Sequence, residues 1–261
     1  QDVVHCVRFT GDGKTLLSCS EDRTVAETKV AAVVGVGVGA AVDETRTEVV
    51  GRMRGHSSGV RSVVVVDKSE HCIVTCGDDG TIRTWDKRHG RSEHDSFVGA
   101  GRPITAAAWF LLFTADSSIE EHQRIVVCGD NVGVLTAYNS TNNPSSNNRV
   151  VPLWSKSATL SSSSHSAITD VLPASKERKI GAASMYLRVV LFAAVDGEHL
   201  RVLDAEDWVN TVVINSTGNM VVGGGDAASM YVWLWSGKKR ERQKKARRRR
   251  KRRWHPHHCR S

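Results

Sequence analysis

The chain has 261 residues and a mass of 28.5 kDa, with 40% apolar and 25% charged residues, which is enough for one large domain or two small ones. Its formal net charge of +8 is unevenly placed, because residues 238–253 hold 13 basic residues and one Glu, and the rest holds 23 basic and 27 acidic residues. No stretch approaches the ~20 consecutive apolar residues of a membrane-spanning helix, which argues against a helical membrane protein.

Short runs rich in β-branched residues follow one another along the chain, each bounded by Gly, Asp, Asn or Ser. Such runs are typical of β-strands with turn residues between them. Because no segment shows a long helical period, the sequence predicts an all-β body. The clearest expected strands are 4–9, 15–20, 60–66, 72–76, 81–85, 124–128, 188–194 and 209–214.

These runs also resemble one another, which indicates an internal repeat. The best copy is 55–86, in which an apolar strand, a turn, a second strand, a Gly-Asp turn and a third strand follow in order. In the other copies the turn carries an Asp or Asn, so we expect equivalent positions near Asp22, Asp79, Asn131, Asp196 and Asp226. Low-complexity segments at 30–42, 139–149 and 157–166 make the spacing irregular and are expected to be exposed loops.

Residues 55–86 resemble a WD repeat. Gly55-His56 matches the Gly-His element of that family, and Trp85-Asp86 matches its Trp-Asp dipeptide at the right spacing. The resemblance implies that His56, Thr75, Asp79 and Trp85 form a buried hydrogen-bonded set, which a buried carboxylate needs for its stability. The first copy departs from the pattern, since it keeps Ser18 but has Thr28 where the family has Trp.

The family resemblance implies an all-β WD-repeat β-propeller, built from four-stranded antiparallel blades. We expect the propeller to occupy 1–236 and a disordered basic tail to occupy 237–261. The related proteins have about seven blades, whereas about five are recognisable here. They lie near 1–28, 47–88, 95–140, 149–205 and 206–236.

An unclosed ring would expose an apolar blade face and a sheet edge. The chain begins with Gln1 instead of Met and shows no secretory signal, so we expect a fragment or a processed start.

A narrower resemblance links three features to the group of WD repeat-containing protein 55 and its fungal relatives: the run 60–88, the segment 163–180, and a last repeat followed directly by a basic tail. Those relatives are nucleolar proteins of ribosomal RNA maturation. The resemblance therefore implies a non-enzymatic scaffold that binds proteins on its faces, in the nucleus and nucleolus.

The basic tail cannot fold alone, because its like charges repel and it buries nothing apolar. It fits either a nuclear targeting signal or a contact with the phosphates of pre-ribosomal RNA, and the sequence leaves both open. The residues expected to carry either role are Lys238, Lys239, Arg240, Lys244, Lys245, Arg247, Arg248, Arg249, Arg250, Lys251, Arg252 and Arg253.

A second function is suggested by the W-D-x-R pattern at 85–88. In some WD-repeat proteins this pattern meets the adaptor of a cullin ubiquitin ligase, and here Asp86 and Arg88 would make that contact. The alternative hypothesis is therefore a substrate receptor of such a ligase.

We expect no enzyme activity, no cofactor and no resident metal. The sequence holds no G-x-S-x-G, H-E-x-x-H or phosphate-loop pattern and no CxxC pair. The scattered cysteines mostly lie in apolar strand-like runs, where we expect core packing in a reducing, intracellular compartment. They are Cys6, Cys19, Cys72, Cys76, Cys128 and Cys259.

Overall fold

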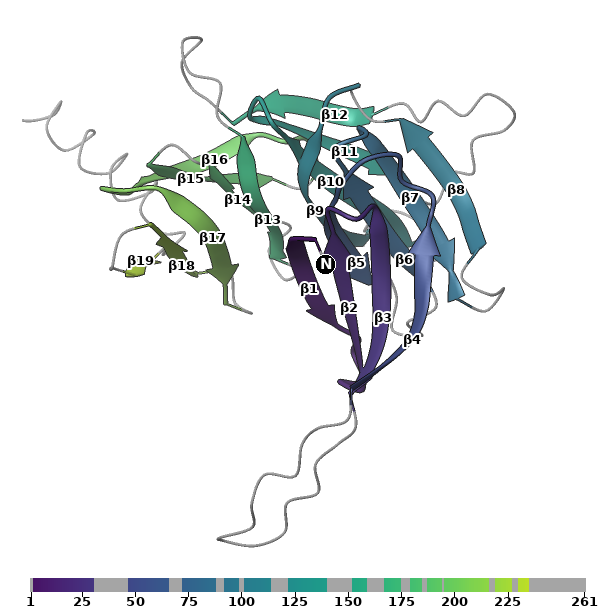
Figure 1. Ribbon diagram of the computed structural model, residues 1–261. Helices are drawn as coiled ribbons and strands as arrows, with labels where there is room; N and C mark the ends of the chain where they lie inside the picture. Colours follow the sequence, from purple (N-terminus) through teal and green to yellow (C-terminus); the bar gives the residue numbers. More distant parts are fainter. Residues whose placement is uncertain are drawn as a thin grey trace, which may run out of the picture.

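The computed structural model places the strands of the chain in five antiparallel sheets. It describes residues 2–30, 47–65, 72–87, 92–98, 101–113, 122–139, 152–158, 167–174, 179–184, 187–193, 195–215, 219–226 and 230–234. The prediction of an all-β, WD-propeller-like fold is confirmed (Figure 1). Within these ranges no helix is long and apolar enough to cross a membrane.

Each sheet is a simple meander, because strands that follow one another along the chain are also neighbours in the sheet. Sheet A contains β1 (Val4–Phe9), β2 (Thr15–Ser20), β3 (Thr24–Val30) and β4 (Thr47–Arg54). Sheet B contains β5 (Val60–Val65), β6 (Cys72–Gly77), β7 (Thr81–Asp86) and β8 (Ser92–Val98). Sheet C contains β9 (Ile104–Phe113), β10 (His122–Asp130), β11 (Val134–Asn139) and β12 (Pro152–Ser157).

Sheet D contains β13 (Ile168–Ala174), β14 (Lys179–Ser184), β15 (Arg188–Ala193) and β16 (His199–Asp204). Sheet E contains β17 (Val209–Ile214), β18 (Met220–Gly225) and β19 (Met230–Leu234). The first strands of the sheets gather near the centre of the molecule, and the fourth strands lie towards its edge (Figure 1).

The sheets are offset from the repeats that the sequence suggests. The range 47–88 begins with β4, which is the outer strand of sheet A, and the range 149–205 begins with β12, the outer strand of sheet C. A repeat in the sequence therefore starts with the last strand of one sheet and continues into the next sheet.

The pairing register is the same in all five sheets. In each, the first and second strands pair with one bulge, which follows the first residue of the inner strand. The residues at that register position are Val4, Val60, Ile104, Ile168 and Val209. A bulge changes the direction of the side chain of the bulged residue. Because this bulge occurs at the same register position of every inner strand, the five sheets repeat one structural unit.

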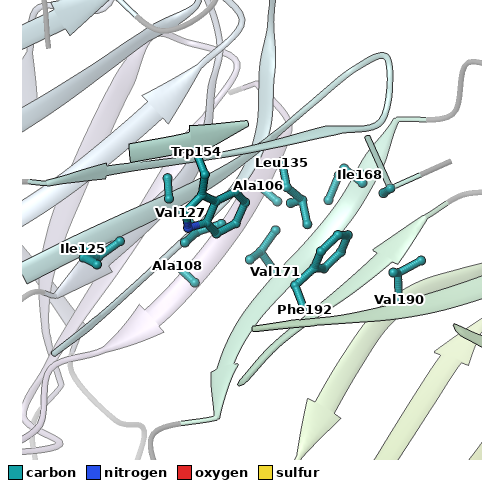
Figure 2. Close-up of a cluster of buried hydrophobic side chains, with 12 residues drawn as sticks. Ala106, Ala108, Ile125, Val127, Leu135, Trp154, Ile168, Val171, Val190 and Phe192 are labelled. Carbon is teal, nitrogen blue, oxygen red and sulfur yellow. The ribbon is translucent and has the colours of Figure 1, made fainter. Parts of the chain in front are cut away.

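Apolar side chains fill the space between consecutive sheets. Between sheets C and D, Leu135 and Trp154 pack with Ile168 and Phe192, and Phe192 is fully buried (Figure 2). Further clusters lie between sheets A and B, B and C, and D and E. Each fully buried large apolar side chain contributes about 1.5–3 kcal/mol relative to exposure, so the stability of a sheet depends on its neighbours.

The two end sheets each leave one face uncovered within the described part of the chain. Val7 of sheet A is 44% exposed, whereas Val63, at the same register position in sheet B, is 0% exposed. At the other end, Met230 of sheet E is 69% exposed, and its equivalent Ile82 in sheet B is 0% exposed. The first face of sheet A and the last face of sheet E are thus apolar and open to solvent.

Candidate functional site: the hydrogen-bonded set of sheet B

Four side chains predicted from the sequence come together in sheet B. His56 lies in the loop between β4 and β5, Thr75 on β6, Asp79 in the turn between β6 and β7, and Trp85 on β7. The side chains of His56 and Asp79 are 1% and 3% exposed, and Thr75 and Trp85 are buried. Three separate segments of backbone therefore meet at one polar cluster.

The turn that carries Asp79 depends on two glycines. Gly80 has a φ of +70°, a conformation that glycine adopts without steric cost. Gly77 lies so close to the backbone of Gly59 that a Cβ atom would meet the Gly59 carbonyl oxygen at 2.3 Å. The Gly-Asp-Asp-Gly sequence of this turn thus brings the Asp79 carboxylate up against the preceding loop.

The four side chains form one continuous chain of hydrogen bonds. The indole Nε1 of Trp85 donates to the hydroxyl oxygen of Thr75 at 2.9 Å, and that hydroxyl lies 2.7 Å from Nε2 of His56. Nδ1 of His56 lies 2.9 Å from Oδ2 of Asp79. A neutral histidine with its proton on Nδ1 satisfies every partner, because Thr75 then donates to Nε2 and the carboxylate accepts from Nδ1.

The Asp79 carboxylate also organises its own turn. The backbone amide and the hydroxyl of Thr81 donate to its Oδ1 at 3.0 and 2.8 Å, and the amide of Ser57 donates to its Oδ2 at 3.0 Å. Burial alone would raise the pKa of Asp79, but the hydrogen bonds from His56 and Thr81 outweigh it and hold that pKa well below its ordinary value of 3.8. The set therefore ties an ionised carboxylate to the loop and to both strands.

Sheet A holds a partial version of this arrangement. Asp22 accepts from the amide and hydroxyl of Thr24 at 3.0 and 2.7 Å, as Asp79 does from Thr81. Its second oxygen is met by Arg52 of β4 at 3.3 Å, where sheet B has His56. Thr28 occupies the register position of Trp85, as the sequence indicates.

In sheets C and D the register corrects the expected turn residues. Val132, and not Asn131, stands at the centre of the turn between β10 and β11, because Gly129, and not Cys128, occupies the register position of Cys76. Asp196 lies in the turn between β15 and β16, the third and fourth strands of sheet D, whereas Asp79 lies between a second and a third strand, so the predicted equivalence of the two residues is wrong.

An aromatic residue occupies the Trp85 register position in every later sheet. Tyr138, Phe192 and Trp233 each pair across to the second strand at that position, opposite Val126, Ile180 and Val221. The sequence pattern missed Phe192 as part of this series because the residues of β14 (Lys-Ile-Gly-Ala-Ala-Ser) give little strand signal.

A second polar cluster, which sequence reasoning did not identify, joins sheets A and B. Arg61 donates from Nε to Oδ2 of Asp78 at 2.8 Å, and its Nη1 lies 3.0 Å from Nε2 of His5. His5 in turn lies 2.7 Å from Glu21, which is also 3.5 Å from Arg61. His5 and Arg61 are the bulge residues of their sheets, so the shared bulge directs both side chains to the same place.

The described residues of the W-D-x-R segment are buried or engaged in contacts with sheet A. Asp86 is buried, with 7% of the residue exposed. Lys87 reaches across to sheet A, where its Nζ lies 2.5 Å from Oε1 of the buried Glu27. Arg88 falls outside the described residues, as does the whole basic tail from 237 to 261.

The described residues contain no group of three or more His, Cys, Asp or Glu side chains placed to hold a metal ion. Both nitrogens of His56 are engaged within the set, and the set is buried. This arrangement holds backbone segments in place and does not present a reactive group to a substrate.

Comparisons with known proteins agree with this geometry. The family model "WD domain, G-beta repeat" matches residues 1–26 and 47–86, which span most of sheet A's first three strands and the complete set of sheet B. Among curated proteins, the chain is similar to the ribosome biogenesis protein erb1 of Aspergillus niger and to the ribosome biogenesis protein ERB1 of Chaetomium globosum.

Both similarities are 39% identical over 56 residues. They cover 22% of this chain and only 7% of the length of either relative. The comparison gives no specific support to the group of WD repeat-containing protein 55. Together, the matched repeats, the hydrogen-bonded set and the five equivalent sheets show a propeller-like all-β fold that carries WD repeats at residues 1–26 and 47–86.

Proposed function

We propose that this chain is a non-enzymatic interaction scaffold of ribosome biogenesis, which acts in the nucleolus. In this proposal the sheets bind partner proteins, and the basic tail contacts pre-ribosomal RNA. The observation that carries it is the 39% identity over 56 residues to two proteins named for ribosome biogenesis. The resemblance of the chain to nucleolar WD-repeat proteins of ribosomal RNA maturation points the same way.

The division of charge supports the RNA contact. Thirteen of the sixteen residues at 238–253 are basic, whereas the rest of the chain carries more acidic than basic residues. A polyanion would therefore be drawn to the tail and not to the body. Each phosphate that a basic side chain neutralises releases bound counterions, so binding through the tail must weaken as salt rises.

A binding titration tests the role of the tail. The intact chain is compared with a variant in which every Lys and Arg of 238–253 is replaced by Gln, using fluorescence anisotropy of a labelled single-stranded ribosomal RNA fragment. We expect the logarithm of the intact chain's affinity to fall by about 0.7 per phosphate contacted for each decade of salt, or a slope of about −4 for six contacts. The Gln variant should bind weakly, with a slope near zero.

A second comparison separates RNA contact from targeting. An unrelated nuclear import signal is fused to the Gln variant, and precursor ribosomal RNA is measured in complexes purified with this protein and with the intact chain. If the RNA contact matters, the variant enters the nucleus but recovers several-fold less precursor RNA than the intact chain. Equal recovery would mean that the tail acts only as a targeting signal.

The ligase-receptor hypothesis stays a prediction without a favouring observation. Asp86 is buried and the neighbouring Lys87 is engaged with Glu27, so a contact through this segment would fall to Arg88. A pull-down with the cullin adaptor, comparing the intact chain with Arg88→Ala, tests it. Adaptor binding that Arg88→Ala abolishes would establish the receptor function.

A further inference from the structure

Two cysteines lie directly opposite each other in sheet A. Cys6 on β1 and Cys19 on β2 are cross-strand partners next to the bulge at His5. Directly opposed residues have Cα atoms about 4.5–5.5 Å apart and side chains on the same face. That spacing lies within the range of about 4.4–6.8 Å that a disulfide requires.

The surroundings of Cys6 favour its thiolate. The largest effect is a hydrogen bond between the two thiols, and a backbone hydrogen bond to Val63 of sheet B and the nearby Arg8 act in the same direction. Burial and Asp170 oppose them, yet the pKa of Cys6 is lowered. The same hydrogen bond, and then burial, raise the pKa of Cys19. Cys6 is half-buried and Cys19 is buried, so solvent reaches the more acidic thiol first.

We propose that Cys6 and Cys19 form a reactive thiol pair that hydroperoxides oxidise to a disulfide within sheet A. The thiolate of Cys6 attacks the terminal oxygen of the hydroperoxide, the O–O bond breaks to leave a sulfenic acid, and the departing oxide takes a proton from solvent and leaves as water or an alcohol. The thiol of Cys19 then gives up its proton and attacks the Cys6 sulfur, the S–O bond breaks, and the hydroxide takes up that proton and leaves as water. The two thiols together give up two electrons, and the peroxide accepts them.

The chain contains its own reference for this pair. At the same register position in sheet B, Cys76 lies opposite Ser62. Cys72 lies opposite Asp86, and Cys128 lies opposite Ala107 and Thr136. Among the cysteines that the structure describes, Cys6 and Cys19 therefore make up the one directly opposed pair.

The test is oxidation of the folded full-length chain by hydrogen peroxide, followed by alkylation of the remaining thiols and peptide mapping by mass spectrometry. Cys259 lies outside the described residues and is replaced by Ser in all proteins, so that it cannot pair between molecules. We expect loss of two alkylatable thiols per chain and a peptide that links Cys6 to Cys19. Reduction with dithiothreitol should restore both thiols.

Variants separate the two roles. Cys6→Ser should remove the loss of thiols, and Cys19→Ser should leave a sulfenic acid at Cys6 that a dimedone probe labels. Cys76→Ser is the matched control and should oxidise as the parent chain does. Circular dichroism verifies that each variant is folded.

A second opposed pair tests whether cross-strand geometry alone is enough. Ser62→Cys places a thiol opposite Cys76 at two buried positions, where no exposed thiolate is available, and should cause no further loss of thiols. The proposal is overturned if peptide mapping of the folded parent chain finds Cys6 and Cys19 both alkylatable after peroxide treatment. Equal loss of thiols in Cys6→Ser would also overturn it.

Discussion

Sheets A and B have the same strand order and the same register, yet their inner strands meet different surroundings. Val63 of sheet B is buried against sheet A, while Val7, its equivalent in sheet A, faces solvent. Sheet B also carries the complete hydrogen-bonded set, whereas in sheet A Arg52 of β4 binds the Asp22 carboxylate and Thr28 occupies the Trp85 position. The same apolar pattern therefore has a different energetic value in each sheet, set by whether another sheet covers it.

The largest expected loss of stability comes from placing a charge at the valine position that is buried in sheet B and exposed in sheet A. Val63→Asp buries a carboxylate among apolar side chains and should lower the free energy of unfolding by about 3–5 kcal/mol. Val7→Asp places the same charge on an exposed face and should change it by less than about 1 kcal/mol. Urea denaturation followed by circular dichroism measures both, and equal losses would mean that the first face of sheet A is covered in solution.

A smaller effect is expected for the ion pair that crosses between the two sheets. Lys87→Met leaves the buried Glu27 carboxylate without the ammonium group of Lys87 and should cost about 3 kcal/mol in the same measurement. The reference is Arg188→Met, which breaks a pair with Asp204 whose side chains are 48% and 77% exposed, and it should cost less than about 1 kcal/mol. Similar losses for both variants would contradict tight packing between sheets A and B.

The smallest expected loss of stability is that of the Asp79 carboxylate, and it should depend on pH. Because the pKa of Asp79 is lower in the folded chain than its ordinary value of 3.8, its contribution to stability is present above that pH and is lost as pH falls through the folded value. Asp79→Asn should cost about 1–2 kcal/mol at neutral pH. The difference between the parent chain and the variant should shrink as pH is lowered from about 5 towards 2.

Asp22→Asn serves as the reference in sheet A, where the carboxylate has an exposed Arg52 in place of a buried His56. We expect it to cost less at neutral pH than Asp79→Asn. A difference that stays constant with pH for Asp79→Asn would show that the carboxylate is not held in its ionised form by the set.

The sequence predicted the strands where apolar alternation and turn residues coincide. The expected strands 72–76 and 81–85 became β6 and β7, and the Gly-Asp turn between them places Asp79 beside His56. Both the local turn chemistry and the spacing to Trp85 are properties of a short segment, so they can be recognised without knowledge of the rest of the fold.

Other features depend on contacts between distant segments and could not be predicted in this way. Asp196 has a turn sequence between two strand-like runs, and these runs are the third and fourth strands of sheet D. The sequence did not indicate the second strand, β14, because that strand is built largely from small residues. The cluster of Arg61 with His5, Asp78 and Glu21 depends on the bulges at His5 and Arg61, and the residue types at these positions do not predict a bulge. The exposure of Val7 depends on the sheet order, since its own sequence pattern matches that of buried strands.

The most direct test of the proposed function is sucrose-gradient sedimentation of the tagged chain from nuclear extract, with the intact chain compared with the variant whose tail basic residues are Gln. The account predicts that the intact chain migrates with pre-ribosomal particles. It also predicts that the Gln variant, or raised salt, shifts the protein to the light fractions. Migration of the intact chain in the light fractions alone, at low salt, would contradict the assignment to ribosome biogenesis.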